Sequence, residues 1–205
     1  MYALLIIIVV SLALLLGIFL LNFYRDPRRE IPFGKNSIVS PADGKVISIV
    51  KISKFGKSKI DKGMFGKIKT LTKDVAEECY AISIFMSPLN VHVNRSPIKG
   101  TVKSIRHTPG KFFMAYDLKK SLENEKNEII IENAHLKIKV IQIAGFLARR
   151  IHCYAHINQK LNKGQKIGMI SLGSQATIII PKTVNLIIKL HDKVKAGETV
   201  IADLN

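Results

Sequence analysis

The stretch GMISLGSQATIIIP, residues 168–181, decides the fold of this chain. Two apolar runs of the kind found in β-strands stand on either side of the pair Gly173-Ser174. A two-residue hairpin turn between such strands normally contains Asn-Gly or Asp-Gly, and this junction contains neither. The stretch therefore predicts two buried strands, and it leaves open why a flexible residue and a hydroxyl group interrupt an apolar sequence.

Outward from this stretch, the chain continues as short β-type runs. Segments rich in Ile and Val alternate with clusters of Gly, Pro and Asn, which predicts a mainly β domain of sandwich or barrel type. We expect a hairpin that turns near Asn133, a short helix or a polar loop near residues 119–126, and a strand or one helical turn at 149–155. The β-type runs are residues 44–52, 79–86 with its continuation at 87–105, 128–148, 166–181 and 185–190.

A weak internal repeat favours curved hairpins. Residues 158–170 resemble residues 191–203, and Gly164 of the first copy matches Gly197 of the second. Both copies are predicted to form a strand, a glycine-containing turn and a second strand, and residues 40–50 are a cruder third copy. The pattern is typical of lipoyl-like or barrel-sandwich hairpins, and by itself it indicates an architecture and no function.

The N-terminal segment predicts a membrane helix. Residues 3–21 carry no charge, and a helix of this length covers roughly the 30 Å hydrocarbon core of a bilayer. Basic residues, beginning with Arg25, follow the helix. The positive-inside rule then places the main domain on the cytoplasmic side of the cell membrane. We expect a membrane helix at 1–23, a linker at 24–37 and the main domain at 38–205.

The net charge of +17 narrows the choice of partners. Strongly basic chains favour polyanions, which means nucleic acid or anionic lipid. The sequence has no recognisable nucleic-acid motif, so an anionic phospholipid membrane is the expected partner, and a compositional bias towards lysine is the alternative explanation of the charge. Cys79 and Cys153 match neither metal-site nor redox spacing, and we expect no metal.

The pair Gly173-Ser174 permits a reaction of the chain with itself. The Ser174 hydroxyl can attack the carbonyl of the residue before it, at the high effective concentration that proximity gives. Glycine on the acyl side removes steric bulk and tolerates a strained backbone. The resulting ester can undergo β-elimination, which cuts the chain, and hydrolysis of the dehydroalanine then leaves a pyruvoyl group. An ordinary turn or bulge is the alternative, because Gly-Ser pairs are common.

Five segments, in order along the chain, carry a resemblance to a known family. The chain resembles the phosphatidylserine decarboxylases in their short bacterial and archaeal form, over nearly its whole length. The last segment holds Ser174 at the position where that family forms its pyruvoyl group. The segments are FYRDPRREIP at 23–32, IVSPADGKV at 38–46, IFMSPLNVHVNRSPIKG at 84–100, IQIAGFLARRIHCYA at 141–155 and GQKIGMISLGSQATIIIP at 164–181.

The resemblance implies a role for each residue that matches a family motif. Ser174 is the nucleophile in self-cleavage of the bond to Gly173 and then becomes the pyruvoyl cofactor. His92 is the expected general base, because imidazole titrates near neutral pH. Asp43, in the Pro-Ala-Asp-Gly turn, is expected to orient that histidine, which makes an Asp-His-Ser arrangement.

Three arginines are candidates for binding the substrate. Long members of the family carry a second histidine three residues after the first, where this chain has Arg95. The resemblance makes Arg95 a candidate for binding the phosphate or the carboxylate of the substrate. Arg149 and Arg150 are candidates for the phosphate of the headgroup, with a solvated turn as the alternative.

Three positions depart from the family pattern. Short members often have a basic residue where Gln175 follows the serine, and Arg and Phe where Ser171 and Leu172 stand. The Gly-Ser pair is retained, so the departures bear on how the carboxylate or the headgroup is held next to the pyruvoyl group.

The resemblance implies a self-cleaving lyase of phospholipid biosynthesis that converts phosphatidylserine into phosphatidylethanolamine and CO₂. Cleavage would give a β chain, 1–173, and an α chain, 174–205, that stay together as a heterodimer; a higher oligomer is left open, and nucleic acid is not expected as a partner. An archaetidylserine decarboxylase, acting on ether lipids, is the alternative enzyme. A non-catalytic, membrane-tethered, lipoyl-like binding module is the alternative from another class.

Overall fold

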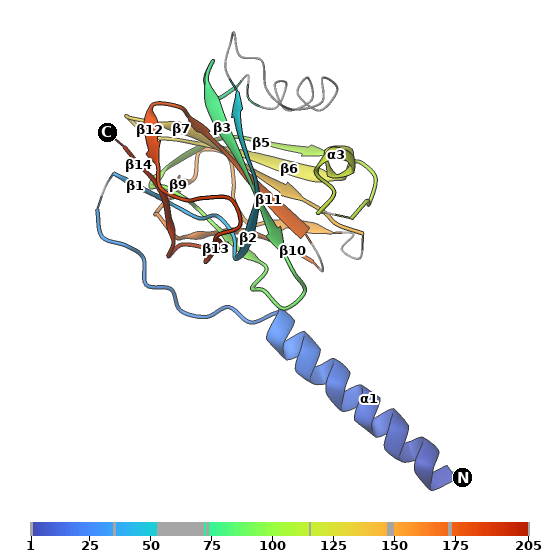
Figure 1. Cartoon of the computed structure of the whole chain (residues 1–205). Helices are drawn as coiled ribbons and strands as arrows, with labels where there is room; N and C mark the ends of the chain where they lie inside the picture. The colour runs from blue at the N-terminus through green and yellow to red at the C-terminus, as the bar shows by residue number, and fades with distance from the viewer. Residues whose placement is uncertain are drawn as a thin grey trace.

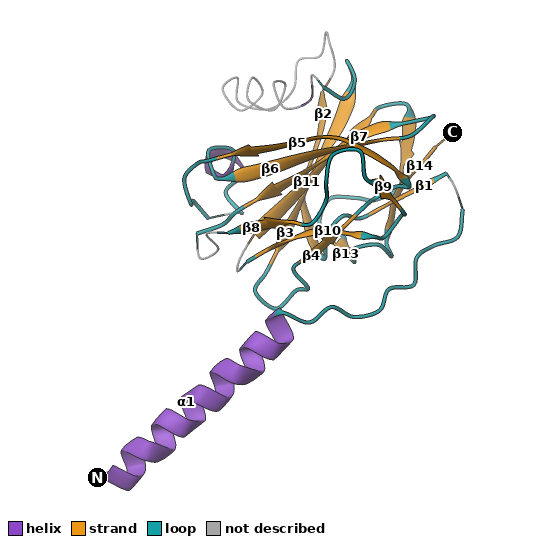
Figure 2. Ribbon diagram, turned by 180° about the vertical axis from the view of Figure 1, so that it is seen from behind, coloured by secondary structure: helices purple, strands orange, loops and turns teal. Residues whose placement is uncertain are grey.

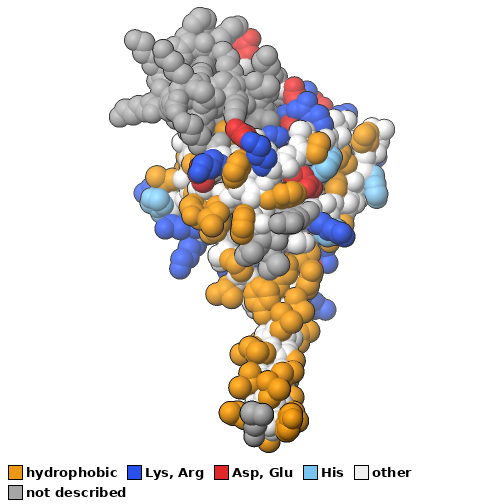
Figure 3. Space-filling model, turned by 90° about the vertical axis from the view of Figure 1, so that its right-hand side faces the viewer, with side chains coloured by type: hydrophobic (Ala, Val, Ile, Leu, Met, Phe, Trp, Pro, Cys, Tyr) orange, Lys and Arg blue, Asp and Glu red, His pale blue; other side chains and the backbone are white. Residues whose placement is uncertain are grey.

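The chain folds into a β domain from which one long helix projects (Figure 1). The helix α1, Tyr2–Phe23, has a mean hydropathy of 3.3 and is long and apolar enough to cross a membrane. Its side chains form a hydrophobic column that stands out from the domain in Figure 3. The expected N-terminal apolar helix is therefore confirmed. The computed structural model describes residues 2–34, 36–52, 72, 74–114, 116–146, 150–171 and 174–204, of Lys119 the backbone only.

In the part of the chain that the structure describes, the domain consists of one large sheet and two small sheets. The large sheet has eight antiparallel strands in the order β13-β2-β3-β11-β7-β6-β5-β9 and is curled like half of a barrel (Figure 2). The predicted mainly β, barrel-like fold is thus confirmed. Its strands are β2 Gly44–Ile52, β3 Cys79–Met86, β5 Gly100–Thr108, β6 Lys126–Glu132, β7 Lys137–Ile143, β9 Lys160–Leu161, β11 Ser174–Pro181 and β13 Lys193–Val194.

The two small sheets have three antiparallel strands each. One has the order β1-β14-β12 and the other the order β4-β10-β8. Their strands are β1 Ser37–Val39, β14 Val200–Leu204, β12 Val184–Leu186, β4 Val93–Arg95, β10 Lys166–Ile170 and β8 Ile151–Cys153.

Most of the strand predictions agree with these elements. The runs at 44–52 and 79–86 coincide with β2 and β3, and β6 and β7 form the predicted hairpin with its turn at Asn133. Residues 151–153 form a strand, and a short helix, α3 Leu118–Ser121, lies near the predicted position. The strand predicted at 185–190 is wrong beyond Leu186, where β12 ends.

The strand β11 lies in the middle of the large sheet, between β3 and β7. Because side chains alternate along a strand, Ala176, Ile178 and Ile180 face the main core, which the small sheets also help to fill. Ile179 faces the other way, into a smaller apolar cluster that includes Val50. Every residue of β11 up to Ile180 is buried, so its sequence is continuously apolar or uncharged.

The junction that the sequence left unexplained connects two different sheets. The strand before it, β10, pairs with β4 and β8, whereas the strand after it, β11, pairs with β3 and β7. A hairpin turn is therefore not needed here, because these two consecutive strands do not pair with each other. Leu172 and Gly173 lie outside the described residues.

The two copies of the internal repeat have similar backbones, but the hairpins predicted for them are wrong: β9 and β10 lie in different sheets, and so do β13 and β14. Asn158 and His191, at matching positions, both have positive φ angles, of 66° and 75°. Gly164 and Gly197 also match, with φ of 78° and 79°, a conformation that glycine adopts without strain. A Cβ atom at either glycine would lie close to Ile31. The linker that follows α1 therefore packs against both turns of the repeat.

The cruder third copy is better matched to a segment that the sequence analysis did not pair with it. The Ser40 hydroxyl donates to the Ala42 carbonyl at 2.7 Å, and the Ser96 hydroxyl donates to the Ile98 carbonyl at the same distance. The two Ser-Pro-x-x-Gly turns, SPADG at 40–44 and SPIKG at 96–100, are visible in the sequence and were the signal for this correspondence.

Candidate active site

Ser174 is the first residue of β11 and is fully buried. It pairs with Met86, the last residue of β3, so it lies at the end of the large sheet. Its hydroxyl donates to Met86 Sδ at 3.5 Å. A thioether is a weak acceptor, so this contact holds the hydroxyl only loosely and leaves it free to react.

His92 is also fully buried, in the loop between β3 and β4. Its Nδ1 lies 2.9 Å from the Asn90 carbonyl oxygen, which accepts hydrogen bonds and cannot donate them. Nδ1 therefore carries the proton, and Nε2 carries the lone pair. Nε2 is buried without a hydrogen-bond partner among the described residues. The ring is thus held in the tautomer that a general base needs.

The pKa of His92 is lowered from its ordinary value of 6.5 to about 4. The largest cause is burial, which disfavours the charged imidazolium. The hydrogen bond to Asn90 raises the pKa, and the positive charge of Arg25 lowers it. The neutral, basic form of His92 therefore prevails at physiological pH.

The fold brings the backbone at His92 close to the chain that leads into Ser174. The Ile170 N–H, at the end of β10, donates to the His92 carbonyl at 3.3 Å. Three residues separate Ile170 from Ser174. Residues 171–173 join β10 of one sheet to β11 of the other, and we call this segment the crossover. The predicted base lies near the start of the crossover, and the predicted nucleophile follows its end.

Asp43 does not make the contact with His92 that the sequence analysis expected. Its carboxylate binds the buried guanidinium of Arg29, with nitrogen–oxygen distances of 3.0 and 3.1 Å, and accepts a hydrogen bond from the Ala196 N–H at 2.8 Å. The Asn90 carbonyl holds the imidazole instead. This correction follows from the linker, because Arg29 lies against the Pro-Ala-Asp-Gly turn and occupies its carboxylate.

Arg95 is buried and already has two partners. Its guanidinium forms an ion pair with Asp26 at 2.5 Å and donates to the Gly164 carbonyl at 2.9 Å. Its Nε has no partner among the described residues. Arg95 therefore links the linker to the first turn of the repeat, and its terminal nitrogens are engaged within the chain.

Arg150 is exposed and adjoins the crossover. Its carbonyl accepts a hydrogen bond from the Ser171 N–H at 3.1 Å, so its backbone runs beside the residues that precede Ser174. Two predicted site residues lie outside the described residues: Arg149, the third candidate for substrate binding, and Gly173, the acyl side of the predicted cleavage site.

Three buried side-chain amides, which the sequence analysis did not single out, form a hydrogen-bonded row that begins at Met86 Sδ, the sulfur that the Ser174 hydroxyl also contacts. Asn94 Nδ2 lies 3.8 Å from Met86 Sδ, and Asn94 Oδ1 accepts from Gln142 Nε2 at 2.9 Å. Gln142 Oε1 in turn accepts from Asn127 Nδ2 at 2.9 Å. Asn94 and Gln142 stand in two of the quoted family segments, at 84–100 and 141–155, and polar residues within these apolar strands were the available signal.

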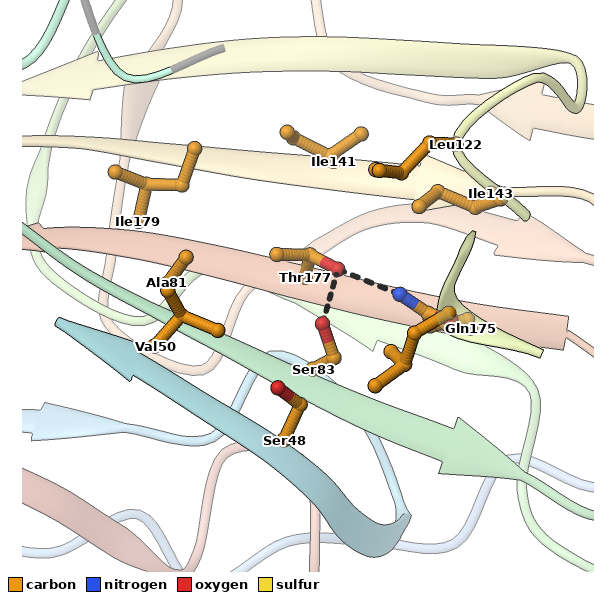
Figure 4. A pocket seen from close by; sticks show the side chains of 11 residues that line it. Ser48, Val50, Ala81, Ser83, Leu122, Ile141, Ile143, Gln175, Thr177 and Ile179 are labelled. Carbon is orange, nitrogen blue, oxygen red and sulfur yellow. Dashed lines mark hydrogen bonds between the residues drawn. The ribbon is translucent and has the colours of Figure 1, made fainter. Parts of the chain in front are cut away.

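Gln175, one of the departures from the family pattern, points to the opposite face of the sheet. It lines an apolar pocket there and donates to the Thr177 hydroxyl at 2.9 Å, and Thr177 lies 3.0 Å from Ser83 (Figure 4). The Gln175 side-chain oxygen accepts from the Ser121 hydroxyl of α3 at 3.3 Å. Because Ser174 faces the main core, this pocket lies across the sheet from its hydroxyl.

Comparison with known proteins decides the family. The sequence model described as phosphatidylserine decarboxylase matches residues 16–202. The chain belongs to the phosphatidylserine decarboxylase family. The predicted family and the predicted class of enzyme, a pyruvoyl-dependent carboxy-lyase, are thus confirmed.

Individual decarboxylases are similar over most of their length. The phosphatidylserine decarboxylase proenzyme of Chlorobium phaeobacteroides is 44% identical over 184 residues, which cover 90% of this chain and 78% of that protein. The proenzyme of the same name from Prosthecochloris aestuarii is 43% identical over 196 residues, 96% of this chain and 82% of that protein. A Methanocaldococcus jannaschii protein named as an archaetidylserine decarboxylase proenzyme is 43% identical over 185 residues, 90% and 89% of the two chains.

The surroundings of Ser174 fit the pyruvoyl group that this decarboxylase family makes from its own chain. The residue is buried among apolar side chains, and a pyruvoyl group is uncharged and no larger than the serine it replaces. Burying it therefore costs no desolvation of a charge. The Asn94 amide, on the same sulfur as the hydroxyl, is a donor close to this position.

Proposed function

We propose that this chain is a proenzyme that cleaves itself before Ser174 and then decarboxylates phosphatidylserine to phosphatidylethanolamine. The observation that carries the proposal is the placement of Ser174. It is a buried serine with a weakly held hydroxyl, beside a crossover that adjoins a buried histidine whose Nε2 is free to take a proton.

Self-cleavage uses groups of this chain. His92 Nε2 takes the hydroxyl proton as the Ser174 oxygen attacks the Gly173 carbonyl, and the peptide bond is exchanged for an ester. Loss of the Cα proton of Ser174 then breaks the bond between its Cβ and the ester oxygen. Gly173 leaves as a carboxylate, and hydrolysis of the remaining enamine with release of ammonia gives the pyruvoyl group. The carbonyl of that group supplies the electrophile that draws electrons from a bound amine substrate as CO₂ leaves.

The two products of cleavage are expected to stay together as a heterodimer. The α chain, 174–205, contributes β11 to the centre of the large sheet and β14 to the centre of a small sheet. Arg29 of the β chain binds Asp43, which in turn accepts from the Ala196 N–H of the α chain. Separation would expose the buried face of β11 to water, which costs far more than a surface contact.

Substrate binding is proposed for the basic residues beside the crossover. Arg150 is exposed and adjoins Ser171, so it is placed to bind the headgroup phosphate or carboxylate. Arg149 is proposed for the same role from its sequence position. Arg95 would have to give up its ion pair with Asp26 to bind phosphate, and we propose for it a role in holding the linker.

The proposed setting is the cytoplasmic face of a membrane rich in anionic phospholipid. The helix α1 provides the anchor, and the basic residues from Arg25 onwards support the cytoplasmic orientation. Each Lys or Arg held near an anionic surface adds attraction of about 1 kcal/mol. The test is flotation with liposomes after removal of residues 1–25. The shortened chain is expected not to float with neutral liposomes and to bind anionic liposomes only at low salt. Tight binding of the shortened chain to neutral liposomes would contradict the role of α1 as the anchor.

The decisive experiment for self-cleavage compares the full chain with Ser174→Ala on a denaturing gel. The parent chain is expected to give two bands, the smaller with a blocked N-terminus, and the alanine variant one uncut chain. Ser171→Ala is the matched control, because it removes a neighbouring hydroxyl and is expected to cleave. Cleavage of Ser174→Ala at the same bond would refute the serine mechanism, and an uncut parent chain would favour the binding module.

The archaeal relative keeps the ether-lipid alternative in place, since it is as similar as the bacterial relatives. The cleaved enzyme should be assayed for CO₂ release from phosphatidylserine and archaetidylserine of matched chain length in the same micelles. Faster turnover of the ester lipid supports the proposed substrate. Turnover of the ether lipid alone would replace it.

A further inference from the structure

We propose that Phe23, the last residue of the membrane helix, is a positioning residue of the active site. Its ring covers the imidazole of His92, so the helix shapes the catalytic base as well as attaching the protein to the membrane. The inference rests on the proposed role of His92.

The contact is between two buried rings. Phe23 is 1% exposed, although α1 otherwise stands away from the domain. Its ring centroid lies 4.2 Å from that of His92, with the planes tilted by 34°. Tyr24, the next residue, packs edge-on against Phe23 and is itself 60% exposed. Phe23 is therefore the residue through which the end of the helix enters the site.

Arg25 fixes the end of the helix on the loop that holds His92. Arg25 Nη2 donates to the Leu89 carbonyl at 2.7 Å, and Nη1 donates to the Asn22 carbonyl at 2.6 Å. Leu89 precedes Asn90, whose carbonyl accepts from His92 Nδ1. Two contacts thus tie the helix to the imidazole: the guanidinium through the backbone of the loop, and the Phe23 ring directly.

The loop itself is a tight turn that transmits this support. Asn90 Oδ1 accepts hydrogen bonds from both the backbone N–H and the hydroxyl of Ser87, each at 2.8 Å. The turn therefore presents the Asn90 carbonyl to His92 in a fixed direction. A positioning role needs such rigidity, because a base that is misplaced by a fraction of an ångström transfers protons poorly.

The cover over His92 has a consequence that can be measured. Burial is the main reason why the pKa of His92 lies near 4, and Arg25 is the charged side chain that also lowers it. Replacing Phe23 with alanine opens the ring to water, and the pKa is expected to rise towards the ordinary 6.5. A helix that only anchored the protein would leave this pKa unchanged.

The experiment uses the full chain with Ser174→Ala, which prevents cleavage, in detergent micelles. The ring proton signals of the histidines are followed by NMR between pH 3.5 and 8, and His92→Gln identifies the signal of interest. Phe23→Ala is expected to raise the midpoint of His92 by at least one pH unit, about a tenfold change in proton affinity. Phe23→Leu, which keeps an apolar cover, is expected to stay near the parent value.

Tyr24→Ala is the matched control, since it removes a neighbouring aromatic ring that is exposed. It is expected to leave the His92 midpoint in place. An unchanged midpoint in Phe23→Ala, or an equal rise in Tyr24→Ala, overturns the inference. If Phe23→Ala does not fold, Phe23→Gln, which places a polar side chain over the imidazole, decides: a His92 midpoint above that of Phe23→Leu supports the inference, and equal midpoints refute it.

Self-cleavage in chains that retain Ser174 separates this inference from the proposed function. At pH 5.5, Phe23→Ala is expected to cleave about fourfold more slowly than the parent chain, if its His92 pKa is about 6, because less of the base is neutral. At pH 7.5 His92 is largely neutral in both chains, so its protonation should no longer slow self-cleavage of Phe23→Ala relative to the parent chain. A parent chain that does not cleave at all refutes the proposed function, whereas the NMR titration still decides the role of Phe23.

Discussion

The buried, neutral state of His92 makes the stability of the folded chain depend on pH. In the folded chain its pKa is about 4, and in the unfolded chain it is near 6.5. Between these two values the unfolded chain binds a proton that the folded chain does not. Stability from this group is therefore fully present above pH 6.5 and is lost as the pH falls towards 4.

The magnitude follows from the size of the shift. One pKa unit corresponds to about 1.4 kcal/mol, so the full shift amounts to about 3 kcal/mol, of which about 2.5 kcal/mol is expected between pH 7.5 and pH 4.5. His92 is fully buried, so solvent does not screen the effect. A loss of this size is a large share of the stability of a typical domain.

The assay is urea unfolding of the uncut Ser174→Ala chain in detergent micelles, followed by circular dichroism. The same measurement on Ser174→Ala with His92→Gln removes the titrating group and keeps every carboxylate. Between pH 7.5 and pH 4.5, the unfolding free energy of the chain with His92 is expected to fall by about 2.5 kcal/mol more than that of the His92→Gln chain. A difference that stays constant over this range would refute the claim that His92 is held neutral by burial.

Three further substitutions, two of them with a control variant, test other parts of the structure by the same unfolding assay, and the third is also followed by self-cleavage in the chain that retains Ser174. Gly168→Ala should destabilise the fold by about 1–3 kcal/mol, because a Cβ atom at this position would lie 2.5 Å from the His152 carbonyl oxygen. Gly17→Ala is the control and should be neutral, because a Cβ atom there has no neighbouring atom within 4 Å among the described residues. Lys139→Met should lower the free energy of unfolding by about 3 kcal/mol, because Lys139 is fully buried and pairs with Glu128 and Asp74. Lys111→Met is the control: it removes the exposed pair Lys111–Glu123 and should lower the free energy of unfolding by less than about 1 kcal/mol. Asp43→Asn should destabilise the chain, because the Asp43 carboxylate binds Arg29 and the Ala196 N–H. The pH at which self-cleavage falls to half its maximum should stay unchanged, since Asp43 does not contact His92. A shift in that pH would instead support the predicted pairing of Asp43 with His92.

Local pattern was sufficient for the elements of the fold. The strand β2 follows from a run of Ile and Val, and β3 follows from a run of apolar residues that is buried on both faces; such runs favour a strand whatever the partner strand is. The long apolar helix α1 follows from nineteen uncharged residues at 3–21, and the repeat follows from glycines that allow a positive φ. These properties belong to short segments, so they can be predicted without knowledge of the tertiary structure.

Sequence also determined the family and the reactive pair Gly173-Ser174, because ordered motifs are one-dimensional information. Tertiary structure alone decided which groups surround the chemistry. Asp43 binds Arg29 instead of His92, Arg95 binds Asp26, and the ring of Phe23 covers the imidazole. Each of these contacts joins residues from separate segments, and several partners of suitable charge or shape compete for each side chain. Which partner is chosen depends on the packing of the linker against the domain, which no local pattern encodes.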